Sequence, residues 1–193
     1  MKVIKLIDLK SISKTDIVVY PTDTIYGLGC YALNANLVSR LRALKQRDIK
    51  PFSIIVSKEW IRDNCVVNDF VEEYLRKLPG SYTIILELKN KDSIASNVNN
   101  GSFFVGVRIP DHPIVKFLPI PFITTSVNIS GQPHINSIDD IPKDMKNKID
   151  LIIDVGHLDN KPSTVVDLTK DKAVVLRKWK EFLLYMVRVS ILK

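Results

Sequence analysis

Cysteine and histidine are scarce in this chain. Its 193 residues include two cysteines and three histidines, and the histidines stand far apart, at His112, His134 and His157. A disulfide framework and a cysteine-rich zinc site are therefore excluded, and the histidine spacing matches no metal-ligand pattern. Two cysteines without such a framework fit a reducing cytoplasm best, and this is the compartment we expect.

Long hydrophobic runs are also missing. The N-terminal segment MKVIKLIDLKSISK contains no apolar core long enough for a signal peptide. The longest apolar-rich stretch, residues 182–192, is too short to span a bilayer and contains Arg188. The sequence therefore predicts a protein with no membrane partner.

What is present is the composition of a folded, basic domain. Hydrophobic residues make up 46% of the chain and charged residues 25%, which is enough apolar material for one core. The 28 lysines and arginines exceed the 21 acidic residues, which gives a net charge of +7 and a calculated pI of about 9.3. We expect a single domain over residues 1–193 with an anionic partner; ATP, pyrophosphate and RNA would each satisfy this charge.

Apolar, β-branched runs alternate with segments of helical periodicity. This pattern predicts an α/β domain with a mixed, twisted β-sheet and flanking helices. We predict strands at residues 17–20, 53–56, 82–88, 103–109, 122–127, 151–155, 164–168 and 173–176. We predict helices at residues 34–46, 68–78, 112–118 and 139–148. The terminal extension, residues 179–193, is compatible with either a helix or a strand.

The first unusually polar segment, PTDTIYGLG (21–29), follows a buried strand directly. It is compatible with a strand-ending turn, but three hydroxyls, a carboxylate and two glycines favour a lined pocket at a strand end. Residues 27–32 also match G-x-G-x-x-A. That motif needs its first glycine directly after the strand and an acidic residue about 20 positions later. Because Gly27 stands well beyond Tyr20 and the downstream residues are Lys45-Gln46-Arg47-Asp48, we exclude dinucleotide binding.

A second polar segment, residues 44–52, places three cations at the end of a predicted helix: Lys45, Arg47 and Lys50. Cations at a helix C-terminus commonly complement the helix dipole in solvent. Here the chain enters a buried strand at once, so the cations are held near the sheet, where they could neutralise a polyphosphate. No GxxxxGK[ST] loop is present, so a P-loop is excluded.

Two further segments are polar at strand ends. Ser126 and Asn128 lie two residues apart, so they share one face of a strand, either as a hydrogen-bonded strand end or as a pair that grips a ligand. The fourth segment, PSTVVD (162–167), begins a strand and is followed by Arg177 after the next strand. Ser163 and Arg108 are each more typical of structural roles when taken alone.

Together and in this order, the segments resemble the YrdC-type threonylcarbamoyl-AMP synthase family. The matching stretches are PTDTIYGLG (21–29), Lys45-x-Arg47 with Lys50-Pro51, VRIPDHP (107–113), SVNISG (126–131), PSTVVDL (162–168) and VLR (175–177). The resemblance runs from about residue 20 to residue 177. It implies a single α/β domain with a twisted mixed sheet around a large, positively charged cavity.

The resemblance also implies a reaction. L-Threonine, bicarbonate or carbon dioxide, and ATP would give threonylcarbamoyl-adenylate and pyrophosphate, with Mg²⁺ accompanying the ATP. A separate complex would then transfer the threonylcarbamoyl group to tRNA. A carbamate attacks phosphorus in this scheme, so no enzyme nucleophile is needed, and catalysis rests on positioning and charge stabilisation.

The family's site residues carry over onto matching positions of this chain. Lys45 and Arg47 would stabilise charge on the phosphates and the carbamate. The nucleotide would be bound by Arg47, Lys50, Ser126, Asn128 and Arg177. Threonine would be bound by Thr24, Arg108 and Ser163, with Arg108 as a carboxylate fork.

The sequence departs from the family pattern at several points. The usual Arg-Pro after the lysine is Arg47-Asp48, the usual Ser-Ala-Asn is SVN (126–128), and the usual Trp-Pro-Gly-Pro-Leu-Thr is LPGSYT (78–83). The Arg-Pro-Gly ending is RKW (177–179). The forms Pro-Gly-x-Tyr-Thr and Lys-Pro-Phe-Ser resemble a paralogous branch of the family, whereas Ser126, Asn128, Ser163 and Arg177 favour the synthase.

Two other functions remain as alternatives. A basic concave surface would also suit a module that binds tRNA or double-stranded RNA without chemistry, although the chain has no aromatic-basic RNP motif. Carbamoyl transfer, as in the related domain of hydrogenase-maturation proteins, is the third, but the acylphosphatase and zinc-finger segments of those proteins are absent.

Overall fold

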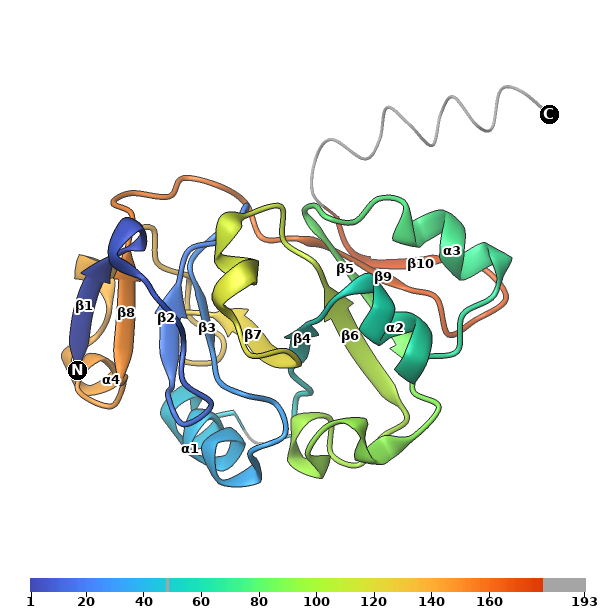
Figure 1. Ribbon diagram of the computed structural model, residues 1–193, viewed down its shortest axis with the longest axis horizontal. Coiled ribbons are helices and arrows are strands. Elements are labelled where there is room, and N and C mark those ends of the chain that lie inside the picture. The colour runs from blue at the N-terminus through green and yellow to red at the C-terminus, as the bar shows by residue number, and fades with distance from the viewer. Residues whose placement is uncertain (48, 179–193) are drawn as a thin grey trace.

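One mixed β-sheet of ten strands runs through the structure, a computed structural model that describes residues 1–47 and 49–178 (Figure 1). The strand order is β1-β8-β2-β3-β7-β4-β6-β5-β9-β10. The strands are β1 (Lys2–Lys5), β2 (Val18–Tyr20), β3 (Gly27–Gly29), β4 (Ser53–Ile55), β5 (Tyr82–Glu87), β6 (Phe104–Arg108), β7 (Phe122–Ser126), β8 (Leu151–Asp154), β9 (Thr164–Asp167) and β10 (Val174–Arg177). The α/β class with a mixed sheet is confirmed.

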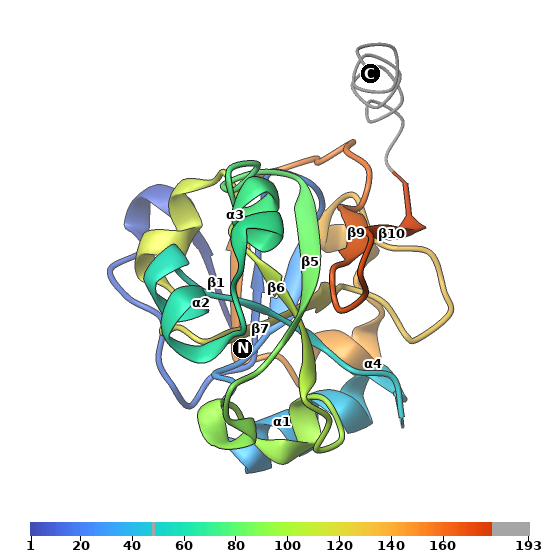
Figure 2. The same cartoon turned by 90° about the vertical axis from the view of Figure 1, so that its right-hand side faces the viewer.

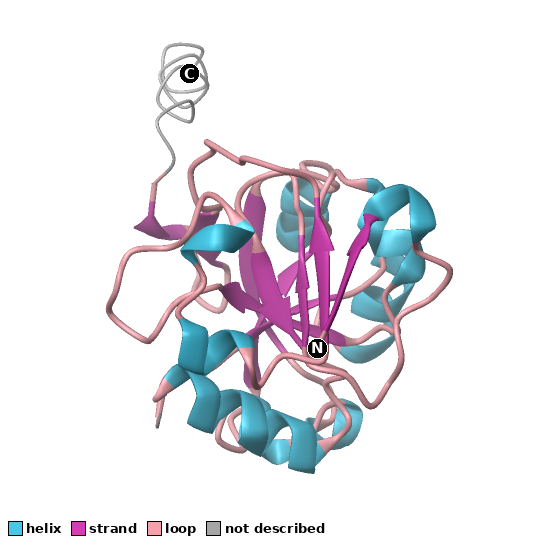
Figure 3. Cartoon of the chain, turned by 90° about the vertical axis from the view of Figure 1, so that its left-hand side faces the viewer, coloured by secondary structure: helices cyan, strands magenta, loops and turns pink. Residues whose placement is uncertain are grey.

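Short helices surround the sheet (Figure 3). The α-helices are α1 (Ala35–Lys45), α2 (Lys58–Asn64), α3 (Asp69–Leu75) and α4 (Lys143–Lys146). Five 3₁₀ helices complete the described part: η1 (Leu6–Asp8), η2 (Lys91–Ser93), η3 (Ser96–Val98), η4 (Pro113–Phe117) and η5 (Ile138–Asp140). Among these helices none is long and apolar enough to cross a membrane.

Side chains of β2, β4, β7 and β8 alternate between two hydrophobic clusters, one on each face of the sheet. Val19 and Ile54 belong to the larger cluster, which also takes in buried residues of α1, α2 and α3. Tyr20 and Ile55 point into the smaller cluster, which includes Ile114 of η4. This alternation follows from the period of two in a strand.

Helix α1 brings a cationic segment to the centre of the sheet. Asn34 caps its first turn, because the Asn34 side chain accepts a hydrogen bond from the backbone N–H of Leu37. The helix ends at Gln46, whose φ of 48° is left-handed. The face with Leu41 and Leu44 packs into the core, and Lys45 at the last turn is buried with it.

The glycines at 27 and 29 belong to a strand that the sequence pattern does not predict. β3 pairs antiparallel with β2, so the chain makes a hairpin here instead of a strand-turn-helix unit. A Cβ at Gly29 would lie 1.7 Å from the carbonyl oxygen of Ile123, so only glycine allows this close approach. The exclusion of a dinucleotide-binding motif is consistent with this geometry.

Most predicted strands are confirmed within one or two residues, but several helices differ. The predicted helix at 139–148 is wrong as one element: η5 ends before Pro142, and only Lys143–Lys146 is α-helical. Residues 113–117 form a 3₁₀ helix, and the helix at 68–78 is shortened to Asp69–Leu75. β1 and α2 were not predicted. Strand β9 lies beside β5, and β10 lies beside β9 at the edge of the sheet (Figure 2). The prediction for residues 179–193 falls outside the described residues.

Candidate functional site

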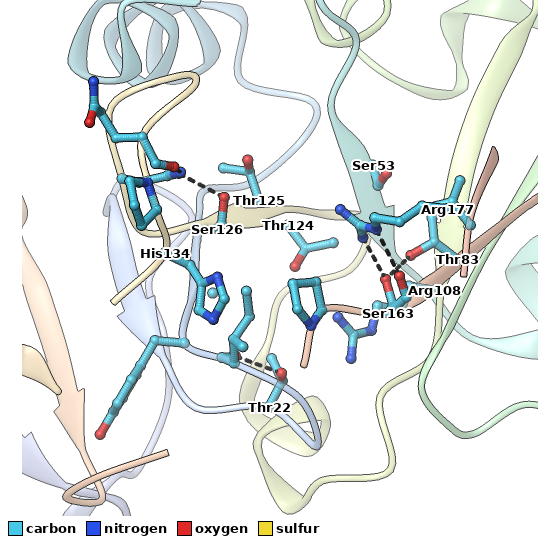
Figure 4. A pocket seen from close by; sticks show the side chains of 18 of the residues that line it. Thr22, Ser53, Thr83, Arg108, Thr124, Thr125, Ser126, His134, Ser163 and Arg177 are labelled. Atoms are coloured by element: carbon cyan, nitrogen blue, oxygen red, sulfur yellow. Dashed lines mark hydrogen bonds between the residues drawn. The ribbon is translucent and has the colours of Figure 1, made fainter. Parts of the chain in front are cut away.

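A polar cavity of about 440 Å³ opens where β3, β7 and β9 converge with the loop after α1 (Figure 4). Its volume suits a small-molecule ligand. Six of the nine predicted site residues line it: Arg47, Arg108, Ser126, Asn128, Ser163 and Arg177. The other three, Thr24, Lys45 and Lys50, are not among the lining residues. The structure thus brings three arginines from distant segments around one hollow.

Arg108 stands at the end of β6, buried with an exposed side-chain fraction of 7%. Its Nη2 atom lies 2.5 Å from Asp23 Oδ1 and donates a hydrogen bond to Thr24 Oγ1 at 2.7 Å. Ser81 Oγ donates to the second Asp23 oxygen. Arg108 Nε is a buried donor with no partner among the described residues. A buried donor without a partner at a cavity wall is a candidate ligand contact.

Ser163 connects Arg177 to the neighbouring strand. Arg177 Nε donates to the carbonyl oxygen of Ser163 at 2.9 Å, and its Nη2 donates to Ser163 Oγ at 3.2 Å. Ser163 Oγ also shares a hydrogen bond of 2.8 Å with Thr83 Oγ1. Partial burial of its guanidinium and the nearby charge of Arg108 both lower the pKa of Arg177. Two cations held this close favour an anionic ligand between them.

Lys45 is 1% exposed and lies behind the cavity wall. Its ammonium donates to the carbonyl oxygens of Ser126 and Asn128, at 2.5 and 2.8 Å, and to Asn128 Oδ1 at 2.8 Å. Ser126 Oγ donates to the same Asn128 oxygen at 2.7 Å. The backbone N–H of Ser130 bonds to the carbonyl oxygen of Lys45. Lys45 therefore fastens the end of α1 to the loop that carries Ser126 and Asn128, while a direct contact with phosphate stays a prediction.

Burial lowers the pKa of Lys45 to about 7, and the charge of Arg47 acts in the same direction. The unfolded chain has a lysine pKa of about 10.4, so between these values the unfolded state binds more protons. We therefore expect the free energy of unfolding of the wild type to rise relative to that of Lys45→Met as the pH increases from about 7 towards about 10. Urea unfolding of both proteins across this range measures the difference. A difference that is independent of pH would contradict a depressed pKa.

Arg47 and Lys50 differ in their relation to the cavity. Arg47 lines the cavity, its Nε donates to the carbonyl oxygen of Lys50 at 3.0 Å, and its guanidinium lies 4.9 Å from the ring centre of Phe52. Burial and the charge of Arg42 lower its pKa. The side chain of Lys50 is exposed and does not line the cavity. The structure shows Lys50 supporting Arg47 through its backbone, and nucleotide contact by its side chain stays a prediction.

Thr24 is buried and reaches the site through Arg108, whereas its neighbour Thr22 lines the cavity. Thr124, Tyr26 and His134 also line it and were missed in the sequence. Thr124 could have been found, because it lies two residues before Ser126 on β7 and shares its side of the strand. His134 carries no sequence signal, since its place depends on the path of the loop.

We expect Mg²⁺ to be bound by the phosphates of ATP and not by a metal site of the protein. The described residues, 1–47 and 49–178, include no group of three or more His, Cys, Asp and Glu side chains that could hold a metal ion. Asp23, the carboxylate near the cavity, is occupied by Arg108 and Ser81. The entry of Mg²⁺ with ATP stays a prediction.

Comparison with curated proteins finds relatives over most of the chain. A candidate threonylcarbamoyl-AMP synthase of Methanocaldococcus jannaschii is 40% identical over 174 residues, which cover 88% of this chain and 82% of that protein. The uncharacterized protein YciO of Escherichia coli is 31% identical over 175 residues, covering 86% of this chain and 84% of that protein. The Pyrococcus abyssi threonylcarbamoyl-AMP synthase is 33% identical over 170 residues, and this chain spans 49% of its length.

The fold is also similar to solved structures of Sua5 and YciO. The crystal structure of P. abyssi Sua5 with L-threonine matches with a TM-score of 0.77 and 32% identity, over 84% of this chain and 50% of that one. E. coli YciO matches with a TM-score of 0.74 and 28% identity, over 84% and 82% of the two chains. The Sua5/YciO/YrdC family model, described as "Telomere recombination", matches residues 10–178. With this match over most of its length, the chain belongs to the Sua5/YciO/YrdC family.

Proposed function

We propose that this chain is a threonylcarbamoyl-AMP synthase, which converts L-threonine, bicarbonate or carbon dioxide, and ATP into threonylcarbamoyl-adenylate and pyrophosphate. The observation that carries the proposal is that Arg47, Arg108 and Arg177 line the same cavity as Ser126 and Asn128. Relatives that are named threonylcarbamoyl-AMP synthase and a similar structure with bound L-threonine support it. The product would pass to a separate complex that modifies tRNA.

Two bond-forming steps make up the reaction. The neutral amine of threonine attacks carbon dioxide, and loss of a proton gives the carbamate. A carbamate oxygen then attacks the α-phosphorus of ATP, and the bond to the leaving pyrophosphate breaks. Negative charge gathers on the carbamate and the phosphates, so fixed cations in a partly enclosed site lower the barrier. Mg²⁺ bound to ATP would add charge neutralisation at the phosphates.

The threonine end of the cavity is assigned to Arg108, Thr24 and Ser163. Arg108 Nε has no partner among the described residues, so it can donate to a carboxylate without breaking an existing bond. Thr24 and Asp23 fix the guanidinium from behind. Ser163 stands next to it and is itself held by Thr83, so the amino acid would bind to a preorganised surface.

The nucleotide end is assigned to Arg47, Ser126, Asn128 and Arg177. Arg47 and Arg177 provide planar guanidinium groups for phosphates, and Ser126 and Asn128 provide hydroxyl and amide groups for the ribose or a phosphate. Lys45 holds this loop in place from behind. The Lys50 side chain is exposed and does not line the cavity, so a contact between Lys50 and the nucleotide requires this side chain to turn towards the cavity.

Pyrophosphate release tests the proposal. We expect release when protein, ATP and Mg²⁺ are combined with both threonine and bicarbonate, and none when either is omitted. Release that requires carbamoyl phosphate instead would assign carbamoyl transfer. No release under any of these conditions, with salt-sensitive binding of double-stranded RNA, would assign an RNA-binding module.

A further inference from the structure

Among the described residues that line the cavity, one aromatic side chain forms no hydrogen bond with another of them. Its aromatic lining residues are Tyr26 and His134. Tyr26 is fully buried, and its hydroxyl donates to the carbonyl oxygen of Gly156 at 2.8 Å and accepts from the backbone N–H of Val155 at 3.0 Å. His134 is half-buried, and no hydrogen bond joins its side chain to another of the described residues.

The backbone on both sides of His134 is fixed. The Asn128 side-chain amide donates to the carbonyl oxygen of Gln132, and the backbone N–H of Gln132 donates to Ile129 at 3.0 Å. On the other side, Ile135 is 7% exposed within the core, and the carbonyl oxygen of Asn136 accepts from Leu158 at 2.8 Å. The ring is therefore presented by an anchored loop, and binding a ligand there costs little ordering of the backbone.

His134 lies at the opposite side of the cavity from two of the arginines. Figure 4 shows its ring on the side of Ser126, across the cavity from Arg108, Ser163 and Arg177. The arginines on the far side suit phosphates and a carboxylate. A nucleotide has one further part, an uncharged base whose large flat faces are best matched by an aromatic ring.

We infer that His134 is a binding residue for the nucleotide base, stacking against it at the Ser126 end of the cavity. This inference deepens the proposed function, because it assigns the part of ATP that the arginines do not contact. Phosphates and threonine then lie towards Arg108 and Arg177, and His134 determines how tightly the base, and not the phosphate chain, is held.

Binding of two probes tests the inference without relying on turnover. The affinities of ATP and of inorganic tripolyphosphate are measured by calorimetry, in the absence of threonine and bicarbonate. For His134→Ala we expect ATP to bind roughly 5- to 150-fold more weakly, the range given by the loss of one stacked base. Tripolyphosphate, which has no base, should bind within about twofold of the wild type, and His134→Phe should restore ATP binding because it keeps a flat ring.

His157→Ala is the matched control, since His157 is exposed and does not line the cavity; it should bind both probes like the wild type. Unchanged ATP affinity in His134→Ala would overturn the inference, as would an equal loss for ATP and tripolyphosphate, which would indicate a phosphate contact. Restoration by His134→Gln but not by His134→Phe would indicate a hydrogen bond and would also overturn it.

These binding measurements, combined with the pyrophosphate assay, separate this inference from the proposed function. A wild type that binds ATP through His134 but releases no pyrophosphate would refute the synthase and leave the base contact standing. A wild type that releases pyrophosphate, with a His134→Ala variant of unchanged ATP affinity, would refute only the base contact. A wild type that does not bind ATP would overturn both.

Discussion

Replacing Arg108 by alanine is expected to abolish threonine-dependent pyrophosphate release and to destabilise the fold. The Arg108–Asp23 pair is buried, with side-chain exposures of 7% and 10%. Removing the guanidinium leaves the Asp23 carboxylate buried without its cation, a change that typically costs about 3–5 kcal/mol. Urea unfolding and the pyrophosphate assay measure the two effects.

Two further variants separate folding from binding. Arg108→Lys keeps the positive charge but not the planar fork, so it should unfold closer to the wild type while threonine binds much more weakly. Arg62→Ala removes the exposed ion pair with Glu72, and its effect on stability should stay below about 1 kcal/mol. Full threonine affinity in a folded Arg108→Lys protein would remove Arg108 from the threonine site.

Replacing Lys45 by methionine should reduce pyrophosphate release at least about 100-fold, although the Lys45 side chain does not line the cavity. The ammonium holds the backbone oxygens of Ser126 and Asn128, and without it these acceptors lose their donor in a buried place. We expect a loss of stability of about 1–3 kcal/mol and a displaced loop. The pyrophosphate assay measures the first effect and urea unfolding the second.

Arg40→Met is the control for this change. Arg40 lies on the same helix with a half-exposed side chain, and it has a long 3.5 Å contact with Asp150. This variant should be nearly as active and as stable as the wild type. A Lys45→Met protein with wild-type activity would contradict this prediction. It would show that the loop keeps its position without the ammonium and that Lys45 is not required for the reaction.

The Lys45 position shows how a sequence motif can be recognised while its physical role is not. Spacing and resemblance single out Lys45 and Arg47 together, as two cations for phosphates. In the structure Arg47 faces the cavity and Lys45 turns into the protein. Residues two apart at the end of a helix point in different directions, so the spacing alone does not distinguish a ligand contact from a support.

Errors in the predicted elements have similar local causes. β1 has a burial pattern that is mostly exposed, so it lacks the apolar alternation by which a strand is recognised. β3 consists of Gly27, Leu28 and Gly29, and glycine disfavours a strand unless close packing requires it. In each case the pairing partner stabilises the strand: β8 for β1, and β2 with β7 for β3.

The sequence by itself determined the α/β class, most of the strands and the set of polar segments that surround the cavity, because hydrophobic period and residue type are local properties. Tertiary structure alone decided that Arg47, Arg108 and Arg177 line one cavity, that Lys45 supports its wall, and that His134 is among the lining residues. Those facts depend on contacts between residues far apart in the chain, such as Lys45 with Asn128 and Arg108 with Asp23. The order of strands in the sheet sets these contacts, and no local pattern encodes that order.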